Sequence, residues 1–190
     1  MKNKNFLTLM QRYVANIAIS GSTLRNQGAK GVTKIAREFL AELDLKVLNK
    51  IIPSGYPEQL DKWTIELKRK LPSGAKNWGT ARKAINVFMV QAFLNKYLTN
   101  EYGLSQFGDA LETPLDSQST SRLRQLAGRG ALPRWTSIKN LRAEHSARYQ
   151  EFALKLAKRY SIPRACLDMI LWRAAEKREI IDTHGGWPMK

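Results

Sequence analysis

The stretch LPSGAKNWGTARKAINVF, residues 71–88, decides how this chain folds. It starts with a Pro-Ser-Gly turn and enters the most apolar helical pattern of the sequence, which runs from Ala84 to Leu98. Apolar side chains cover most of the circumference of that helix, which predicts a central, buried position. A second helix precedes the turn: Pro57 suits its first turn, and its apolar residues recur at helical spacing, namely Leu60, Trp63, Leu67 and Leu71.

Helical spacing also dominates the rest of the chain, whereas alternating strand patterns are hard to locate. Further helices are expected over 32–43, over 149–160 and after Ser161 and Pro163, with loops over 20–31, 51–57, 71–79, 102–116 and 127–135. The first helix should bury one apolar face, made of Phe6, Leu9, Met10, Tyr13, Val14 and Ile17. We therefore predict an all-α fold in one domain, residues 1–182, with a flexible tail over 183–190 that makes His184 and Trp187 incidental.

The balance of charge points to a polyanionic partner. The chain has 32 Lys and Arg against 16 Asp and Glu, a formal net charge of +16 and a sequence pI near 10.2. Solubility needs a net charge of only about 2 to 8, so a merely solvated basic surface is the weaker interpretation. Nucleic acid is the favoured partner, and an anionic membrane surface comes second.

Composition excludes several other classes of protein. At 43% hydrophobic residues the chain is too apolar for a disordered protein. It has no run of 18 apolar residues and no cleavage-site pattern, so we expect neither export nor a membrane anchor. The single cysteine, Cys166, forms neither an internal disulfide nor a metal centre by itself, which fits a reducing cytoplasm. We expect no metal or organic cofactor.

Gly79, Arg82 and Lys83 bring backbone amides and cations to the start of the buried helix, and such a helix start is a ready phosphate site. Lys83 is also a candidate nucleophile, because a lysine among apolar walls and other cations can give up its proton and act as an amine. The alternative is a lysine that reaches solvent or contacts phosphate.

Asp116 follows a Pro-Leu pair and precedes the helix that carries Leu123 and Leu126, so it should cap that helix. Beside a cleft, the same carboxylate could stabilise a developing cation or activate a nucleophile by removing a proton. The two roles are compatible in one residue.

The run WGTARKAINVF (78–88) followed by PLDSQST (114–120) is similar to the helix-hairpin-helix DNA glycosylases, in which a hairpin ends in a lysine and a later aspartate lies in a VD[TS]-like turn. Lys83 matches that lysine and Asp116 that aspartate. Their separation of 33 residues resembles the archaeal 8-oxoguanine glycosylase branch. In LDMILW (167–172), Asp168 and Trp172 match the residues that line the base pocket of that branch, and Gln27 matches loosely as a base contact.

The resemblance implies a two-lobed bundle around a basic cleft, with a helix-hairpin-helix motif that binds DNA. It implies a monomeric, nucleoid-associated glycosylase with lyase activity on double-stranded DNA, in which Lys83 attacks C1′ of a flipped-out nucleotide with help from Asp116. The excised base would be 8-oxoguanine or another modified base, stacked on Trp172 and hydrogen-bonded by Asp168. Arg82, Arg122, Arg124 and Arg129, with Gly79, are the expected DNA contacts.

Two alternatives from other classes stay open. One is a non-catalytic DNA-binding regulator, in which Lys83 only contacts phosphate. The other is an RNA-binding protein, for which the same positive charge serves a different polymer.

Binding to DNA should depend strongly on salt, because each neutralised phosphate releases condensed counterions and contributes about −0.9 to the log–log slope of affinity against salt. Replacing Arg82, Arg122, Arg124 and Arg129 by Gln should weaken binding to all sequences alike and flatten that slope. Titrations of a labelled duplex at several salt concentrations measure both effects. An affinity independent of salt would contradict a nucleic-acid partner.

Overall fold

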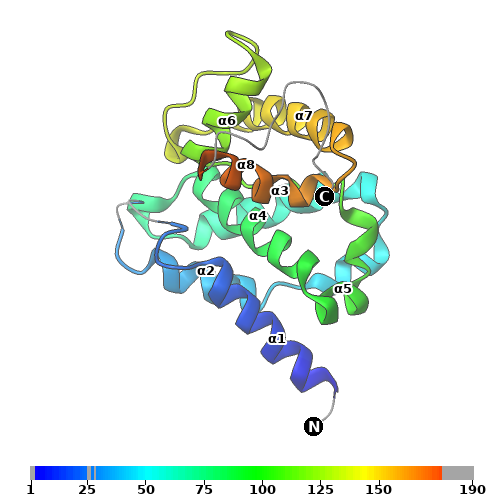
Figure 1. Cartoon of the computed structure of the whole chain (residues 1–190). Coiled ribbons are helices and arrows are strands. Elements are labelled where there is room, and N and C mark those ends of the chain that lie inside the picture. Colours follow the sequence, from blue (N-terminus) through cyan, green and yellow to red (C-terminus); the bar gives the residue numbers. More distant parts are fainter. Residues whose placement is uncertain (1–2, 25–26, 28, 177–190) are drawn as a thin grey trace.

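The fold is all-helical, as predicted. The computed structural model describes residues 3–24, 27 and 29–176, and these contain no strand (Figure 1). The tail over 183–190 lies outside the described residues. The α-helices are α1 (Asn3–Ala18), α2 (Val32–Ala41), α3 (Tyr56–Lys70), α4 (Trp78–Leu94), α5 (Lys96–Tyr102), α6 (Ser117–Ala127), α7 (Ala143–Arg159) and α8 (Leu167–Glu176). Short 3-10 turns connect them, namely η1 (Leu45–Lys50), η2 (Pro53–Gly55), η3 (Ser73–Ala75), η4 (Leu104–Phe107), η5 (Ile138–Asn140) and η6 (Arg164–Cys166).

Helix α4 is the central helix that the sequence predicts, and it packs against α1, α2, α3 and α5. Its length differs from the expectation, because the apolar run 84–98 is divided at Asn95. The Asn95 side chain accepts hydrogen bonds from the backbone amides of Tyr97 and Leu98 and thereby starts α5. A polar N-cap inside an apolar run is therefore enough to end one helix and begin another.

The buried face of α1 was predicted only in part: Val14 is buried as expected, but three of the six expected residues are not. Leu9, Tyr13 and Ile17 are exposed, whereas the polar Gln11 is buried against α2. The Gln11 amide donates hydrogen bonds to the carbonyl oxygens of Leu40 and Leu43, at 3.0 and 2.8 Å. Those bonds satisfy the buried amide, so the face that carries Gln11 can turn inward.

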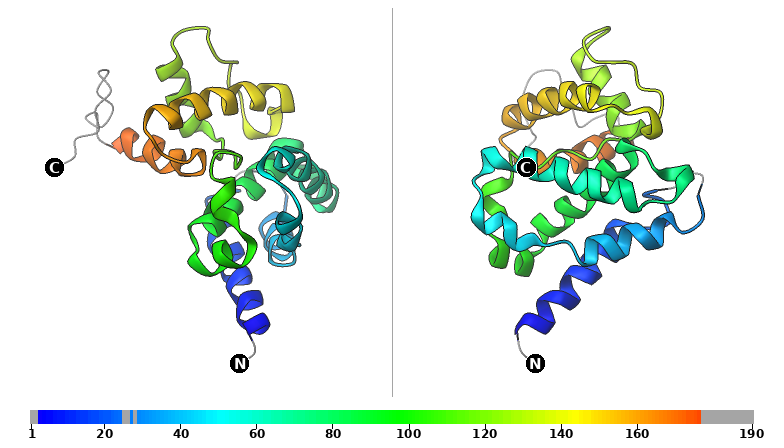
Figure 2. Two further views of the ribbon diagram at one scale, coloured as in Figure 1. Left: turned by 90° about the vertical axis from the view of Figure 1, so that its right-hand side faces the viewer. Right: turned by 180° about the vertical axis from the view of Figure 1, so that it is seen from behind.

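Buried apolar side chains form two clusters. The larger cluster surrounds α4 and is supplied mainly by α1–α5, and the smaller one joins α6, α7 and α8. Helices α6, α7 and α8 lie together in the upper part of the views and α1 at the bottom (Figures 1 and 2). The segment 109–116, a turn followed by backbone without regular structure, leads from the first cluster to the second. Within the described residues, no helix combines the length and apolar character needed to span a membrane.

Gly79 lies in the first turn of α4, where η5 crosses it. A β-carbon at this position would lie 2.0 Å from the carbonyl oxygen of Ile138 and 2.9 Å from Cβ of Leu141. Glycine therefore allows η5 and the segment around it to pack directly on the start of α4.

Gly79→Ala should lower the free energy of unfolding by about 3 kcal/mol or more, since the obstructing atom belongs to the backbone and cannot swing aside. Gly21→Ala is the matched control, because a β-carbon there meets no atom within 4 Å. Urea denaturation of both variants measures the difference. Equal stability of the two variants would show that η5 does not rest on α4.

Candidate active site

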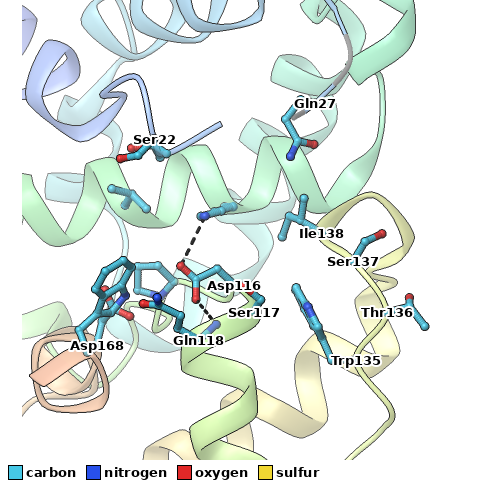
Figure 3. Close-up of a pocket in the computed structure, with 15 residues that line it drawn as sticks. Ser22, Gln27, Asp116, Ser117, Gln118, Trp135, Thr136, Ser137, Ile138 and Asp168 are labelled. Atoms are coloured by element: carbon cyan, nitrogen blue, oxygen red, sulfur yellow. Dashed lines mark hydrogen bonds and ion pairs between the residues drawn. The ribbon is translucent and has the colours of Figure 1, made fainter. Parts of the chain in front are cut away.

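One cavity of about 770 Å³ collects the residues that the sequence singled out. The predicted residues Lys83, Asp116, Gln27, Asp168 and Trp172 all line it, although they come from four separate parts of the chain (Figure 3). Its other lining residues are Ser22, Thr23, Val87, Pro114, Ser117, Gln118, Trp135, Thr136, Ser137 and Ile138.

Lys83 and Asp116 form an ion pair at the wall of the cavity. The Lys83 Nζ atom lies 3.6 Å from Oδ2 of Asp116, and the two side chains are 14% and 19% exposed. The pair is therefore shielded from bulk water but open to a molecule in the cavity. Lys83 projects from the second turn of the buried helix α4, so its backbone is held rigidly.

The predicted helix cap at Asp116 is confirmed. Its Oδ1 atom accepts hydrogen bonds from the amides of Gln118 and Ser119, both at 2.9 Å, and the Ser119 hydroxyl accepts from the Asp116 amide. The cap uses one carboxylate oxygen and leaves the other to face Lys83. Capping thus fixes the direction in which Asp116 presents its charge.

Asp168 places a second carboxyl group in the same cavity. Its Oδ1 atom is buried and has no hydrogen-bond partner among the described residues. Burial, reinforced by the negative charge of Asp116 and opposed by Lys83, raises the pKa of Asp168 to about 7. Near neutral pH this carboxyl group can therefore either donate or accept a hydrogen bond.

Trp172 and Gln27 complete the predicted set. Trp172 lies one helical turn after Asp168 on α8 and is 46% exposed, so a ring face remains open for stacking. Gln27 is buried, and its Oε1 atom accepts a hydrogen bond from the Thr80 hydroxyl at 2.6 Å. That bond fixes the amide of Gln27 relative to the start of α4.

Arg82 does not lie where it could make the phosphate contact expected from the sequence. It is buried, and its Nε and Nη2 atoms both donate to the carboxylate of Glu112 at 2.8 Å. Its Nη1 atom donates to Asp61 at 2.6 Å and to Thr64 at 3.1 Å. The guanidinium is occupied inside the protein, which removes Arg82 from the candidate DNA contacts.

The other expected DNA contacts are outside the cavity. Gly79 is buried beneath η5, as described above, so its α-carbon offers no open approach. Arg122 donates to the Gln125 side chain at 2.5 Å, whereas Arg124 and Arg129 are exposed on α6 and just after it. Of the set, Arg124 and Arg129 remain open to an anionic partner.

Sequence reasoning missed Trp135. This residue is half-buried, lines the cavity and packs edge-on against Tyr149, with ring centroids 6.4 Å apart and an interplanar angle of 88°. It lies in a segment with little regular structure, so no periodic pattern marks it. The available signal was an aromatic residue within an arginine-containing loop, which is typical of nucleic-acid contacts.

The cavity brings together one amine and two carboxyl groups, those of Lys83, Asp116 and Asp168. Among the described residues, no group of three or more His, Cys, Asp and Glu side chains is arranged to hold a metal ion. Comparisons with protein-family models, with curated proteins and with solved structures find no match for this chain. Functional inference therefore depends on an amine and two carboxyl groups around a cavity with aromatic walls.

Asp168→Asn should stabilise the protein in a pH-dependent way. The pKa of Asp168 rises from an ordinary 3.8 to about 7 on folding, so between these values the unfolded chain has lost a proton that the folded chain keeps. Wild-type stability therefore falls as pH rises through this range and stays lower above it. Because Asn does not ionise, the variant should match wild-type Tm at pH 4 and exceed it by about 3 °C or more at pH 8.

Thermal unfolding across this pH range measures the effect. Glu66→Gln, on the exposed surface of α3, makes the same change of charge and should show no such pH dependence. A parallel response of the two variants would assign the effect to net charge rather than to the cavity.

Proposed function

We propose that this protein is a DNA glycosylase with associated lyase activity, which removes a modified base through a lysine Schiff base. The observation that supports this proposal is the shielded ion pair of Lys83 and Asp116, 3.6 Å apart, at the wall of a cavity large enough for a nucleotide. A half-buried, capped carboxylate beside a lysine can accept the proton that the lysine must lose to act as an amine nucleophile.

In the proposed reaction, Asp116 accepts a proton from the Lys83 ammonium group. The free amine attacks C1′ of an extruded nucleotide, so that the bond between Nζ and C1′ forms while the glycosidic bond breaks and the base leaves with the electron pair. Opening of the sugar ring then gives an imine between Nζ and C1′. Loss of a proton from C2′ expels the 3′ phosphate and cuts the strand.

The base would occupy the part of the cavity near Asp168 and Trp172. Trp172 offers a stacking face, and the Asp168 carboxyl group offers a hydrogen bond to the edge of the base. An oxidised purine such as 8-oxoguanine is the proposed substrate, and Gln27 a further contact. Since the pKa of Asp168 is near neutral, this group suits a base edge that presents an acceptor as well as one that presents a donor.

For this reaction we propose a two-lobed bundle, in which the two apolar clusters are the cores of the lobes. Helices α3 and α4 would form the helix-hairpin-helix. The proposed partner is double-stranded DNA, bound by a monomer at the nucleoid. The excess of 16 positive charges supports a polyanionic partner.

Lys83→Gln should abolish both base removal and covalent trapping. The assay incubates the protein with duplexes that carry a panel of modified bases, 8-oxoguanine included, and adds borohydride to reduce any Schiff base. Affinity should change by less than about threefold, since one of many cations is lost. Lys96→Gln, at the exposed start of α5, is the control of equal charge and should keep full activity. A borohydride adduct that still forms when Lys83 is replaced would assign the nucleophile elsewhere.

Asp116→Asn separates the chemical role of this residue from its structural one. Asparagine also caps helices, so the Tm should fall by only about 1 or 2 °C. Base removal should slow by about 100-fold or more, because a neutral amide does not accept the lysine proton. A stable variant with wild-type activity would reduce Asp116 to a helix cap.

A further inference from the structure

The connection between α6 and α7, residues 128–142, belongs to a segment without acidic residues. Between Asp116 and Glu144 the chain carries six cations and no Asp or Glu, although the chain as a whole has one acidic residue for every two basic ones. The six are Arg122, Arg124, Arg129, Arg134, Lys139 and Arg142. Such segregation of charge concentrates positive potential where this connection borders the cavity.

The connection is held in place although it has little regular structure. The Tyr149 hydroxyl donates to the carbonyl oxygen of Pro133 at 2.7 Å, and Arg148 donates to that of Ala131 at 3.0 Å. Farther along, the backbone at Ile138 rests on Gly79 of α4. Trp135 lies between these anchoring points, so its ring is a fixed part of the cavity wall.

Trp135 and Asp168 lie at opposite ends of the cavity, with Asp116 between them (Figure 3). A volume of about 770 Å³ is typical of sites for drug-sized ligands and exceeds that of a single nucleobase. If one end receives the extruded base, the other is free for the adjoining part of the strand.

We propose that residues 128–142 bind the strand beside the extruded nucleotide, with Trp135 stacking on the neighbouring base and Arg134 and Lys139 contacting phosphates. The proposal depends on the glycosylase function given above. With C1′ of the extruded nucleotide at Lys83, the strand must continue away from the Asp168 end. Aromatic rings interspersed with exposed cations and hydroxyl groups are the usual means of holding a strand without reading its sequence. Thr136 and Ser137 supply such hydroxyls next to Trp135.

The test pairs Trp135→Ala with removal of the base on which it would stack. Three duplexes are used: one with a single tetrahydrofuran abasic analogue, and two in which the 5′ or the 3′ neighbour is also tetrahydrofuran. Trp135→Ala should bind the first duplex about tenfold more weakly than wild type, which corresponds to about 1.4 kcal/mol. For one of the two doubly abasic duplexes, Trp135→Ala should lower the affinity by less than about twofold, because the base on which Trp135 would stack is already absent.

Trp135→Phe keeps an aromatic ring beside Tyr149 and should bind the single-analogue duplex within about threefold of wild type. Thermal denaturation shows whether Trp135→Ala is folded. If that variant unfolds, Trp135→Phe still allows the binding of the three duplexes to be compared with wild type. Arg134→Gln should flatten the salt dependence of binding by about one phosphate contact, whereas Lys96→Gln should leave it unchanged.

The outcomes separate this inference from the proposed function. A loss of affinity that is equal for all three duplexes, or absent from all three, overturns the contact between Trp135 and the neighbouring base even if the wild type excises bases. A fourth duplex carries 8-oxoguanine in place of the single analogue, and an effect of Trp135→Ala seen only with that duplex would place the modified base, not its neighbour, on Trp135. The protein could also lose affinity on Trp135→Ala in the flank-dependent way described, yet neither excise bases nor form a borohydride adduct. That result would support the contact between Trp135 and the strand and refute the glycosylase function. Tighter binding to structured RNA than to these duplexes would overturn both.

Discussion

The buried pairing of Arg82 with Glu112 is the interaction on which the geometry of the cavity depends. Arg82 directly precedes Lys83, and Glu112 lies four residues before Asp116. The two parallel hydrogen bonds of 2.8 Å fix both the distance and the relative orientation of α4 and the segment 109–116. Removing one member of such a buried pair typically costs about 3 to 5 kcal/mol, because the other charge is left without compensation.

A second set of buried hydrogen bonds ties the same segment to the C-terminal helices. Gln150 of α7 accepts from the Thr113 amide at 3.0 Å and donates to its carbonyl oxygen at 2.7 Å, as a neighbouring strand would. Arg164 donates to the carbonyl oxygens of Leu111 and Ala110 just before α8 begins. Through these bonds one extended stretch sets the positions of Asp116 and, through η6, of Asp168. The two carboxyl groups of the cavity therefore depend on the hydrogen bonds of a backbone segment that is itself without regular structure.

Helices were the predictable part of this fold, because apolar periodicity and capping residues are local signals. The position of α4 and the cap at Asp116 follow from a few neighbouring residues each, and both were predicted. The face of α1 was predicted only in part, since it depends on the carbonyl groups of Leu40 and Leu43 that satisfy Gln11. In the same way, Arg82 looked like a surface cation until the distant partners Asp61 and Glu112 were in place. Partners remote in sequence are what periodicity cannot supply.

The residues of the cavity show the same limit of prediction from sequence. That Lys83 and Asp116 line one wall could be expected from a resemblance of motifs, but their separation of 3.6 Å depends on the buried bonds around Glu112 and Thr113. Trp135 carried no periodic signal, and its position follows from Tyr149 and from the crossing of η5 over Gly79.

Burying Asp168 beside Asp116 is unfavourable for stability, because two carboxyl groups share a shielded space with a single lysine. A protein selected only to be stable would gain from an apolar residue at that position. A carboxyl oxygen without a hydrogen-bond partner among the described residues, in a cavity that also holds the Lys83–Asp116 ion pair, is instead what a binding partner would complete. The location of this unfavourable burial is therefore an argument for function that is independent of any resemblance in sequence.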